Sequence, residues 1–252
     1  MKKNQGDVMT SKSISRLKRH IKSFFKKLLP GVFPDFSNVK VIIFGDGSEK
    51  VIRYARQLPR KIRINNSGVK NVVKIHKNIK SRNIHISFSD KCIENICVLE
   101  DSLDSTGIAA RIVFLDGVKT ELRIGKGTSM NGTEICLGDG SRCIIGDNCM
   151  FSYNIVIRTT DGHTIVERDT TNILNLQKRD CVIGNHCWIG LRTIINKNTQ
   201  LPDNTIVGSG SVLSGCFSKP YTVIAGNPAK VIKENVEFFC QNIDTFKRIH
   251  NL

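Results

Sequence analysis

His163 is the residue of this sequence best suited to proton transfer, because it stands where a regular pattern calls for an aliphatic side chain. Upstream, Ile145, Phe151 and Ile157 follow one another at intervals of six, so the next inward position is 163. Imidazole titrates near neutral pH and can take a proton from a hydroxyl. Asp161, two residues earlier, could orient the ring or contact a substrate. We expect His163 to act as a catalytic base; the alternative is a corner histidine bonded to nearby backbone.

The pattern itself is clearest in residues 181–215. A period of six fits neither an α-helix nor a simple strand. It is typical of a hexapeptide solenoid, in which each six-residue unit forms one flat side of a parallel β-helix. One column of the repeat is aliphatic and the column two positions earlier is small: Ile183, Ile189, Ile195, Leu201, Val207 and Leu213 against Cys181, Cys187, Thr193, Thr199, Thr205 and Ser211.

Corner residues and one tryptophan complete the repeat. Gly184, Gly190 and Gly208 follow aliphatic positions, where we expect turns that need more backbone freedom than a Cβ allows. Trp188 is the only tryptophan and adjoins the inward Ile189, so we expect it to point outward. An outward indole in a chain with few aromatic residues predicts a covering ligand or subunit.

The repeat defines three regions. Residues 61–233 are expected to form the parallel β-helix, with irregular early coils and a loop insertion at about 164–180 beside His163. Residues 234–252 place apolar side chains at helical spacing and predict a C-terminal helix that covers the last coil. Residues 1–60 form a separate N-terminal region.

The N-terminal region contains a basic amphipathic segment. Residues 10–29 predict a helix that stops at Pro30–Gly31. It would either dock on an anionic membrane surface or pack on the solenoid. Residues 39–60 suggest a strand, a turn and a short helix. The turn Gly45–Gly47 lacks the third glycine of a dinucleotide-binding loop, so that interpretation is not favoured.

Composition limits the partners. The formal net charge of +16 predicts an anionic partner. Nucleic acid is not expected, because the charge is spread out and no nucleic-acid motif is present. The nine cysteines include no CxxC pair, which favours buried free thiols over a disulfide framework or a zinc site. We therefore expect a cytoplasmic protein, at most at the inner face of the membrane, without a metal.

Several motifs in combination resemble the hexapeptide-repeat acyltransferases: Ile-Gly rungs such as Ile145–Gly146, an isolated T-x-D-G-H ending at His163, the W-I-G rung at 188–190 and the closing AGNPAKVIK at 225–233. The similarity covers roughly residues 122–233. It is greatest to bacterial O-acetyltransferases of capsular, polysialic acid and O-antigen polysaccharides. It implies a left-handed parallel β-helix, a homotrimer, and acetyl-CoA bound in the groove between adjacent subunits.

The resemblance also implies roles for individual residues. His163 matches the catalytic base, Trp188 the aromatic residue lining the cofactor and acceptor channel, and Asn131 a side chain near the thioester. With Asp161, Trp188 and Asn131 are the residues expected at the acceptor. The residues expected at acetyl-CoA are Trp188, Leu191, Ser209, Ser214, Gly215, Lys230 and Lys233.

The predicted reaction is acetyl transfer from acetyl-CoA to a hydroxyl of a bacterial surface polysaccharide, with an acidic or lipid-linked glycan as acceptor. One alternative is N-acetylation of a nucleotide-linked amino sugar. A second is a zinc hydratase on the same fold, which needs three converging histidines. A third is a non-catalytic glycan or membrane adaptor.

Overall fold

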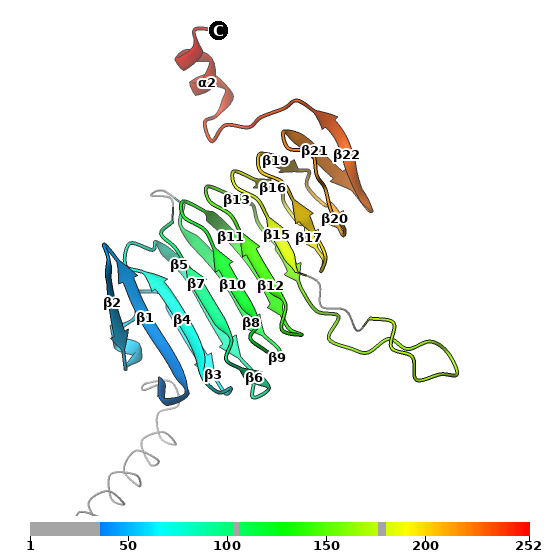
Figure 1. Ribbon diagram of the computed structural model, residues 1–252. Coiled ribbons are helices and arrows are strands. Elements are labelled where there is room, and N and C mark those ends of the chain that lie inside the picture. Colours follow the sequence, from blue (N-terminus) through cyan, green and yellow to red (C-terminus); the bar gives the residue numbers. More distant parts are fainter. Residues whose placement is uncertain (1–35, 103–105, 176–179) are drawn as a thin grey trace, which may run out of the picture. The chain divides into compact units, whose positions relative to one another are not determined.

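A computed structural model describes residues 36–102, 106–175 and 180–252, and this part of the chain is mainly β (Figure 1). The helix predicted at 10–29 lies outside the described residues. Helical structure in the described part consists of the 3-10 turns η1 (Phe36–Asn38) and η2 (Ala55–Gln57) and the helix α2 (Ile243–His250). The prediction of a mainly β chain with parallel strands is confirmed.

The strands form three parallel ladders, which we call faces A, B and C. Face A is the simplest, because each coil gives it one strand and only its first edge is antiparallel, where β2 (Ser48–Ile52) folds back on β1. Its parallel strands lie in the order β1 (Val39–Gly45), β4 (Asn71–His76), β7 (Ile96–Leu99), β10 (Glu121–Ile124), β12 (Arg142–Ile145), β15 (Cys181–Ile183) and β18 (Gln200–Leu201).

Faces B and C are joined through β11 (Ser129–Leu137), which bends at a register shift between Asn131 and Thr133 and so pairs on both faces. Face B continues through β13 (Met150–Phe151), β16 (Trp188–Ile189), β19 (Thr205–Val207), β21 (Thr222–Gly226) and the antiparallel β22 (Ala229–Glu234). Face C contains β3 (Ile62–Asn66), β5 (Ser81–Phe88), β8 (Ile108–Phe114), the second half of β11, β14 (Ile155–Arg158), β17 (Ile194–Ile195) and β20 (Val212–Leu213). A short pair, β6 (Cys92–Ile93) with β9 (Gly117–Val118), stands apart.

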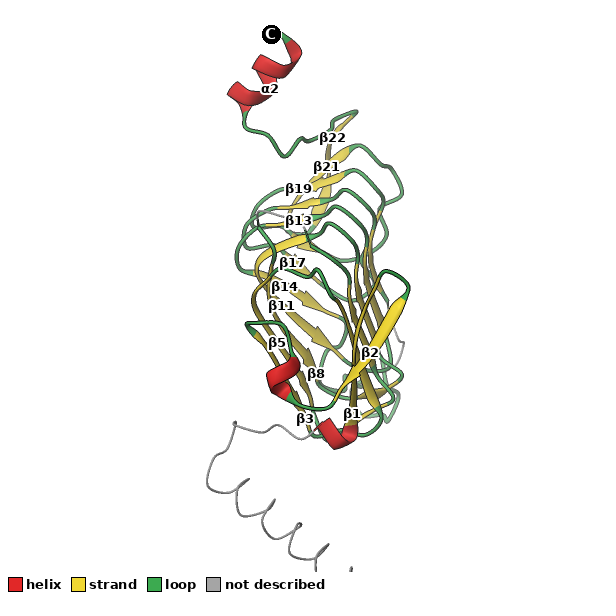
Figure 2. Ribbon diagram, turned by 90° about the vertical axis from the view of Figure 1, so that its left-hand side faces the viewer, coloured by secondary structure: helices red, strands yellow, loops and turns green. Residues whose placement is uncertain are grey.

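The chain visits the faces in a fixed cycle, which makes the fold a solenoid. From β12 it passes to β13 and β14, and the next coil repeats the order as β15, β16 and β17. Figure 2 shows these coils stacked one on the next. Three corners therefore run along the solenoid, named A/B, B/C and C/A after the faces they join.

The predicted inward column is the core. Ile145, Ile183 and Leu201 are register partners on face A and are at most 3% exposed. On face C, Ile195 pairs with Leu213, and both are fully buried. Aliphatic side chains thus stack on their equivalents in the next coil, as the six-residue period predicts.

The small column has a second requirement besides size. Thr193, Thr205 and Ser211 are fully buried, and each hydroxyl donates to the carbonyl three residues earlier at 2.6–2.8 Å. Cysteine plays a similar part, since the thiol of Cys149 lies 3.2 Å from the carbonyl of Gly184 and that of Cys187 lies 3.3 Å from the carbonyl of Pro202. The seven buried cysteines are all free thiols, as predicted, while Cys216 and Cys240 are exposed.

The reason predicted for the corner glycines is wrong. Gly184 and Gly190 have no positive φ angle; the left-handed conformation falls two residues later, on His186 at 50° and on Arg192 at 58°. A Cβ at Gly184 would instead lie 2.4 Å from Oδ1 of Asp203 in the next coil. The glycine is needed because adjacent coils approach each other closely there.

Both ends of the solenoid differ from the predicted boundaries. β1 already pairs in parallel with β4, so the coils begin before residue 61, and the turn at Gly45–Gly47 joins β1 to β2 rather than to a helix. At the other end α2 buries none of its residues and does not cover the last coil. The antiparallel strand β22 pairs with β21 and occupies that edge of face B.

Replacing Ile195 with Ala should lower the free energy of unfolding by about 2–5 kcal/mol, since it deletes a fully buried aliphatic side chain. Ile194 is the matched control, because it belongs to the same strand but is 39% exposed. Ile194→Ala should change the free energy by no more than about 0.5 kcal/mol. Urea unfolding followed by circular dichroism measures both, and equal losses would contradict this assignment of core and surface.

Candidate active site

His163 lies at the C/A corner, where the chain leaves the solenoid. The amide of Thr159 still donates to the carbonyl of Cys136 in the preceding coil, and Thr159 and Thr160 are buried. From Asp161 onward the chain is exposed, and His163 is exposed with it. The expectation that His163 occupies the inward slot is therefore wrong, because the coil ends at Thr160, before that slot is reached.

The insertion that follows His163 is a projecting hairpin (Figure 1). Val166 bridges to Ile173 in antiparallel fashion, and the amide of Leu174 donates to the carbonyl of Ile165 at 2.8 Å. These four aliphatic side chains are 41–60% exposed. Where the chain rejoins face A, Asp180 accepts hydrogen bonds from the backbone and guanidinium of Arg142.

Asn175 ties the hairpin back to the corner. Its Oδ1 accepts from the amide of Ile165, and its Nδ2 donates to Oδ2 of Asp161 and to the carbonyl of His163, each at 2.8 Å. Lys197, at the same corner in the next coil, forms an ion pair with Asp161. Asn175 therefore holds the backbone at His163 directly. Lys197 holds Asp161, two residues earlier.

A cavity of about 360 Å³ opens at this corner, and His163 and Asp161 both line it. Asp116 and Asp139 belong to the two preceding coils and contribute further carboxylates, with the amide of Asp139 donating to Oδ1 of Asp116 at 3.0 Å. The cavity therefore combines an imidazole with carboxylate oxygens that can accept hydrogen bonds from hydroxyl groups. It suits an uncharged, hydroxyl-bearing group better than an anionic one.

The electrostatics of Asp161 follow from its neighbours. Hydrogen bonds from the Lys197 ammonium and the Asn175 amide hold the pKa of the Asp161 carboxyl below its ordinary value of 3.8. Asp161 is therefore ionised at neutral pH. Its carboxylate accepts hydrogen bonds from Lys197 and Asn175. The predicted hydrogen bond that would orient the His163 imidazole is not among these contacts.

Trp188 does not lie near His163 in one copy of the chain. It is 42% exposed on β16, and so points outward as predicted, but β16 belongs to face B. In a three-sided coil, face B lies opposite the C/A corner that carries His163. The indole and the imidazole are therefore on opposite sides of the same solenoid.

The other predicted site residues are divided between edges. Ser214 and Gly215 follow β20 and share the C/A corner with His163, further along the solenoid. Lys230 and Lys233 are exposed on β22, the edge strand of face B. At the B/C corner lie Asn131, bonded to Arg82, and the exposed Leu191 and Ser209. Of the predicted set, the structure brings only Asp161 into the cavity of His163.

The polar side chains of Asn175, Lys197, Asp116 and Asp139 at this site were not predicted. Lys197, Asp116 and Asp139 occupy the same corner in coils within two of the insertion, so stacking the corners would have placed them near His163. Asn175 carries no such signal, because the insertion has no period.

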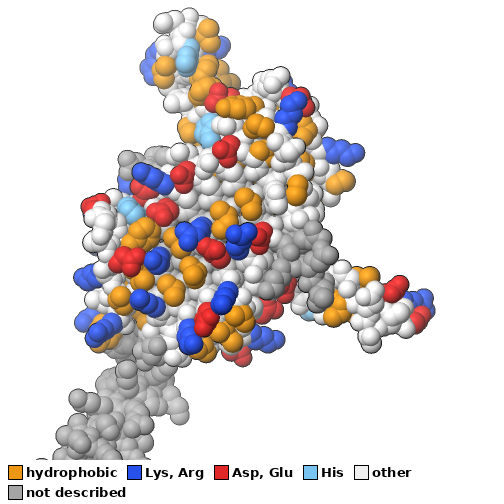
Figure 3. Space-filling view, viewed as in Figure 1, with side chains coloured by type: hydrophobic (Ala, Val, Ile, Leu, Met, Phe, Trp, Pro, Cys, Tyr) orange, Lys and Arg blue, Asp and Glu red, His pale blue; other side chains and the backbone are white. Residues whose placement is uncertain are grey.

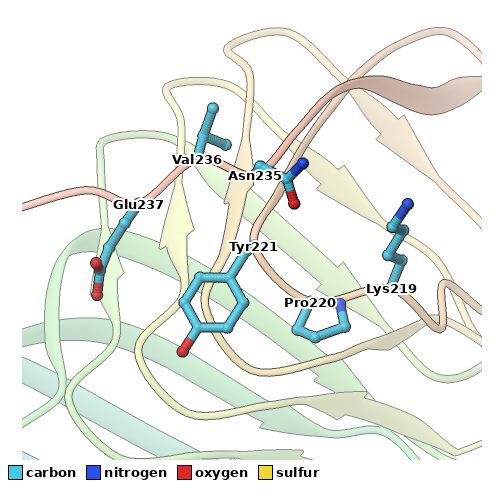
Figure 4. A pocket seen from close by; sticks show the side chains of 6 residues that line it. All are labelled: Lys219, Pro220, Tyr221, Asn235, Val236 and Glu237. Atoms are coloured by element: carbon cyan, nitrogen blue, oxygen red, sulfur yellow. The ribbon is translucent and has the colours of Figure 1, made fainter.

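A second cavity, of about 540 Å³, lies beside the last coil (Figure 4). Lys219, Pro220 and Tyr221 line one side of it, and Asn235, Val236 and Glu237 line the other. Lys219 forms an ion pair with Glu234 near this cavity. The cavity marks the point where the C-terminal segment leaves β22.

Charge is mixed over the visible surface. Figure 3 shows basic, acidic and hydrophobic side chains interspersed over the strands of face A. On this face the positive net charge is not gathered into one patch, as the predicted spread of charge implies.

Among the described residues, no three or more His, Cys, Asp or Glu side chains are grouped so as to hold a metal ion. None of the helices in the described ranges has the length and apolar character needed to cross a membrane.

Comparison with known proteins gives related sequences, although no protein-family model matches the chain. The polysialic acid O-acetyltransferase of Neisseria meningitidis is 33% identical over 115 residues, covering 46% of this chain and 53% of that protein. The galactoside O-acetyltransferase of Escherichia coli (strain K12) is 30% identical over 115 residues, covering 46% of this chain and 55% of that protein. The chain thus spans about half the length of the curated relatives it matches.

Two solved structures extend the similarity. The polysialic acid O-acetyltransferase OatWY is 26% identical with a TM-score of 0.58, covering 77% of this chain and 93% of that one. The polySia-specific acetyltransferase NeuO has a TM-score of 0.59 at 23% identity, covering 72% and 74%, and shows likeness of fold alone.

Lys197→Met should raise the pKa of Asp161 toward 3.8, because it removes the main hydrogen bond to the carboxylate. Since the folded-state pKa is depressed, the contact stabilises the fold above pH 3.8 and is lost as the pH falls through the folded-state value. Carboxyl-carbon NMR titration measures this pKa. Lys219→Met is the control, because Lys219 pairs with Glu234. An unchanged titration of Asp161 in Lys197→Met would refute the assignment.

Proposed function

We propose that this chain, a homologue of the hexapeptide-repeat acetyltransferases, transfers acetyl from acetyl-CoA to a hydroxyl of a bacterial surface polysaccharide. The observation that carries the proposal is the exposed imidazole of His163 in a cavity at the corner where the solenoid is interrupted. The sequence relatives named above are O-acetyltransferases, which favours this reaction over N-acetylation of an amino sugar. The proposal includes left-handed winding of the coils.

In the proposed mechanism His163 is the general base. It accepts the proton of the acceptor hydroxyl as the hydroxyl oxygen attacks the carbonyl carbon of the thioester. A backbone N–H stabilises the resulting oxyanion, a contribution of about 3–4 kcal/mol in comparable sites. When the tetrahedral intermediate collapses, the carbon–sulfur bond breaks and His163 returns its proton to the thiolate. The products are the acetyl ester and free CoA, and no acyl-enzyme forms.

The carboxylates around the cavity constrain how an acceptor binds. Asp116, Asp139 and Asp161 line the same space as His163. An acidic glycan would be repelled if its own charge entered there. We therefore propose that the reacting hydroxyl enters on an uncharged part of the sugar, and that any acidic group of the glycan remains outside the cavity.

The placement of Trp188 supports a homotrimer. His163 and Trp188 lie on opposite sides of one solenoid, so one copy cannot supply both walls of a single site. A neighbouring copy that placed its face B against the C/A corner would bring its Trp188 and the exposed Lys230 and Lys233 toward His163. The exposed aliphatic side chains of the hairpin at 165–174 offer apolar surface for such an interface.

His163→Ala should lower acetyl transfer by about 10²–10⁴-fold, the usual contribution of a general base. His85→Ala is the control, because His85 lies on β5 and contacts Asn65, away from the cavity. The assay is transfer from labelled acetyl-CoA to a panel of bacterial glycans, with light scattering to verify the assembly. A fully active His163→Ala protein would eliminate His163 as the base.

Mixed assemblies test whether two copies build each site. His163→Ala and Trp188→Ala are each expected to be inactive alone. Co-assembled in equal amounts, they should regain roughly one quarter of the wild-type activity, because half the copies supply His163 and half of their neighbours supply Trp188. No recovery in verified mixed assemblies would show that both residues act within one subunit.

A further inference from the structure

The segment after β22 runs back across face B instead of continuing away from it. It leaves beside Tyr221, whose carbonyl accepts from the amide of Val236 at 3.1 Å (Figure 4). Further on, the thiol of Cys240 lies 3.5 Å from the sulfur of Met150 on β13. Because β21, β19, β16 and β13 are successive strands of face B, the segment Val236–Cys240 crosses three coil intervals.

Phe238 is the anchor of this segment. It is 5% exposed and is the only buried residue between Asn235 and Leu252. Its ring stacks on the imidazole of His186 with centroids 4.3 Å apart and planes at 14°. It also contacts the indole of Trp188, with centroids 5.9 Å apart and planes at 48°. The covering predicted for Trp188 is therefore supplied in part by its own chain.

His186 supports this stack from below. Its Nδ1 shares a hydrogen bond of 2.9 Å with Oδ1 of Asn204, which fixes the ring from the next coil. Phe238 covers the face of that ring. An imidazole held in this way serves as a rigid support for Phe238.

We propose that Phe238 is a positioning residue for Trp188: clamped against His186, it holds the indole in the one orientation that can form the site wall. The indole is 42% exposed even with Phe238 in contact. Without that contact, an exposed side chain on a sheet face can adopt other staggered rotamers. The catalytic consequence of this clamp rests on the function proposed above. Its structural consequence does not, because the clamp exists in the free protein.

Fluorescence provides a direct test, since Trp188 is the only tryptophan in the chain. Phe238→Ala should shift the emission to longer wavelength and increase acrylamide quenching by about twofold, because the ring that covers part of the indole is lost. Phe238→Tyr should restore the wild-type signal, and Phe238→Leu should restore part of it. Phe239→Ala is the matched control, because Phe239 is 49% exposed and contacts Phe246 and His250 on α2 instead.

The kinetic test follows from the same variants. Phe238→Ala should lower kcat/KM by about 3- to 10-fold, the equivalent of one aromatic pair, mainly by raising KM. Phe239→Ala should remain at the wild-type value. The acceptors are those that the wild-type protein acetylates.

The two proposals fail in different ways. Wild-type emission and quenching in Phe238→Ala would overturn the clamp, whatever the activity. A fluorescence change accompanied by unchanged kcat/KM and KM would confirm the contact between Phe238 and Trp188 but overturn its consequence for the reaction. If the wild-type protein transfers no acetyl group, the proposed function is lost, while the quenching series still decides whether Phe238 positions Trp188. If Phe238→Ala does not fold, the graded response of Phe238→Leu and Phe238→Tyr decides the question.

Discussion

The close approach of neighbouring coils at their corners is the constraint on which the rest of the structure depends. At each corner a carbonyl is turned into the solenoid and needs a donor, because a buried polar group without a partner is costly. Thr193, Thr205 and Ser211 supply that donor from the smallest side chains that carry a hydroxyl. A Cβ at Gly184 would already collide with the next coil. The six-residue period repeats because every coil must meet both conditions at the same place.

This constraint also decides where function can reside. A coil that packs on both neighbours has no room for a catalytic side chain inside it, so reactive groups must stand on outward positions or in insertions. His163 begins an insertion, and its surroundings are built from corner residues of adjacent coils, Asp139 and Lys197 among them. Trp188 uses the outward position of a regular rung. A three-sided coil necessarily separates the two, which is why assembly of several copies is central to the proposed function.

The sequence predicts most reliably what the period controls. The inward residues from Ile183 to Leu213 are buried as expected, because each faces the same environment in successive coils. Prediction failed where the period is absent. β1 is apolar at nearly every position and is followed by no second aliphatic residue at the six-residue spacing of the repeat, so its membership of face A left no periodic signal. The depth of His163 was misjudged because the chain leaves the coil at Thr160, and nothing in the spacing marks that exit.

In the C-terminal segment, helical spacing of apolar residues occurs where the chain is partly extended. The apolar spacing within residues 234–252 predicts a helix that covers the last coil, yet Phe238 is buried ahead of the helix, which begins only at Ile243. Geometry explains the outcome. Three coil intervals of a sheet measure about 14 Å. The four residue steps from Val236 to Cys240 span about 13 Å when extended but only about 6 Å in a helix. A helical segment could not reach both Tyr221 and Met150, so the contacts across face B require extended chain, and extended chain turns Phe238 toward Trp188.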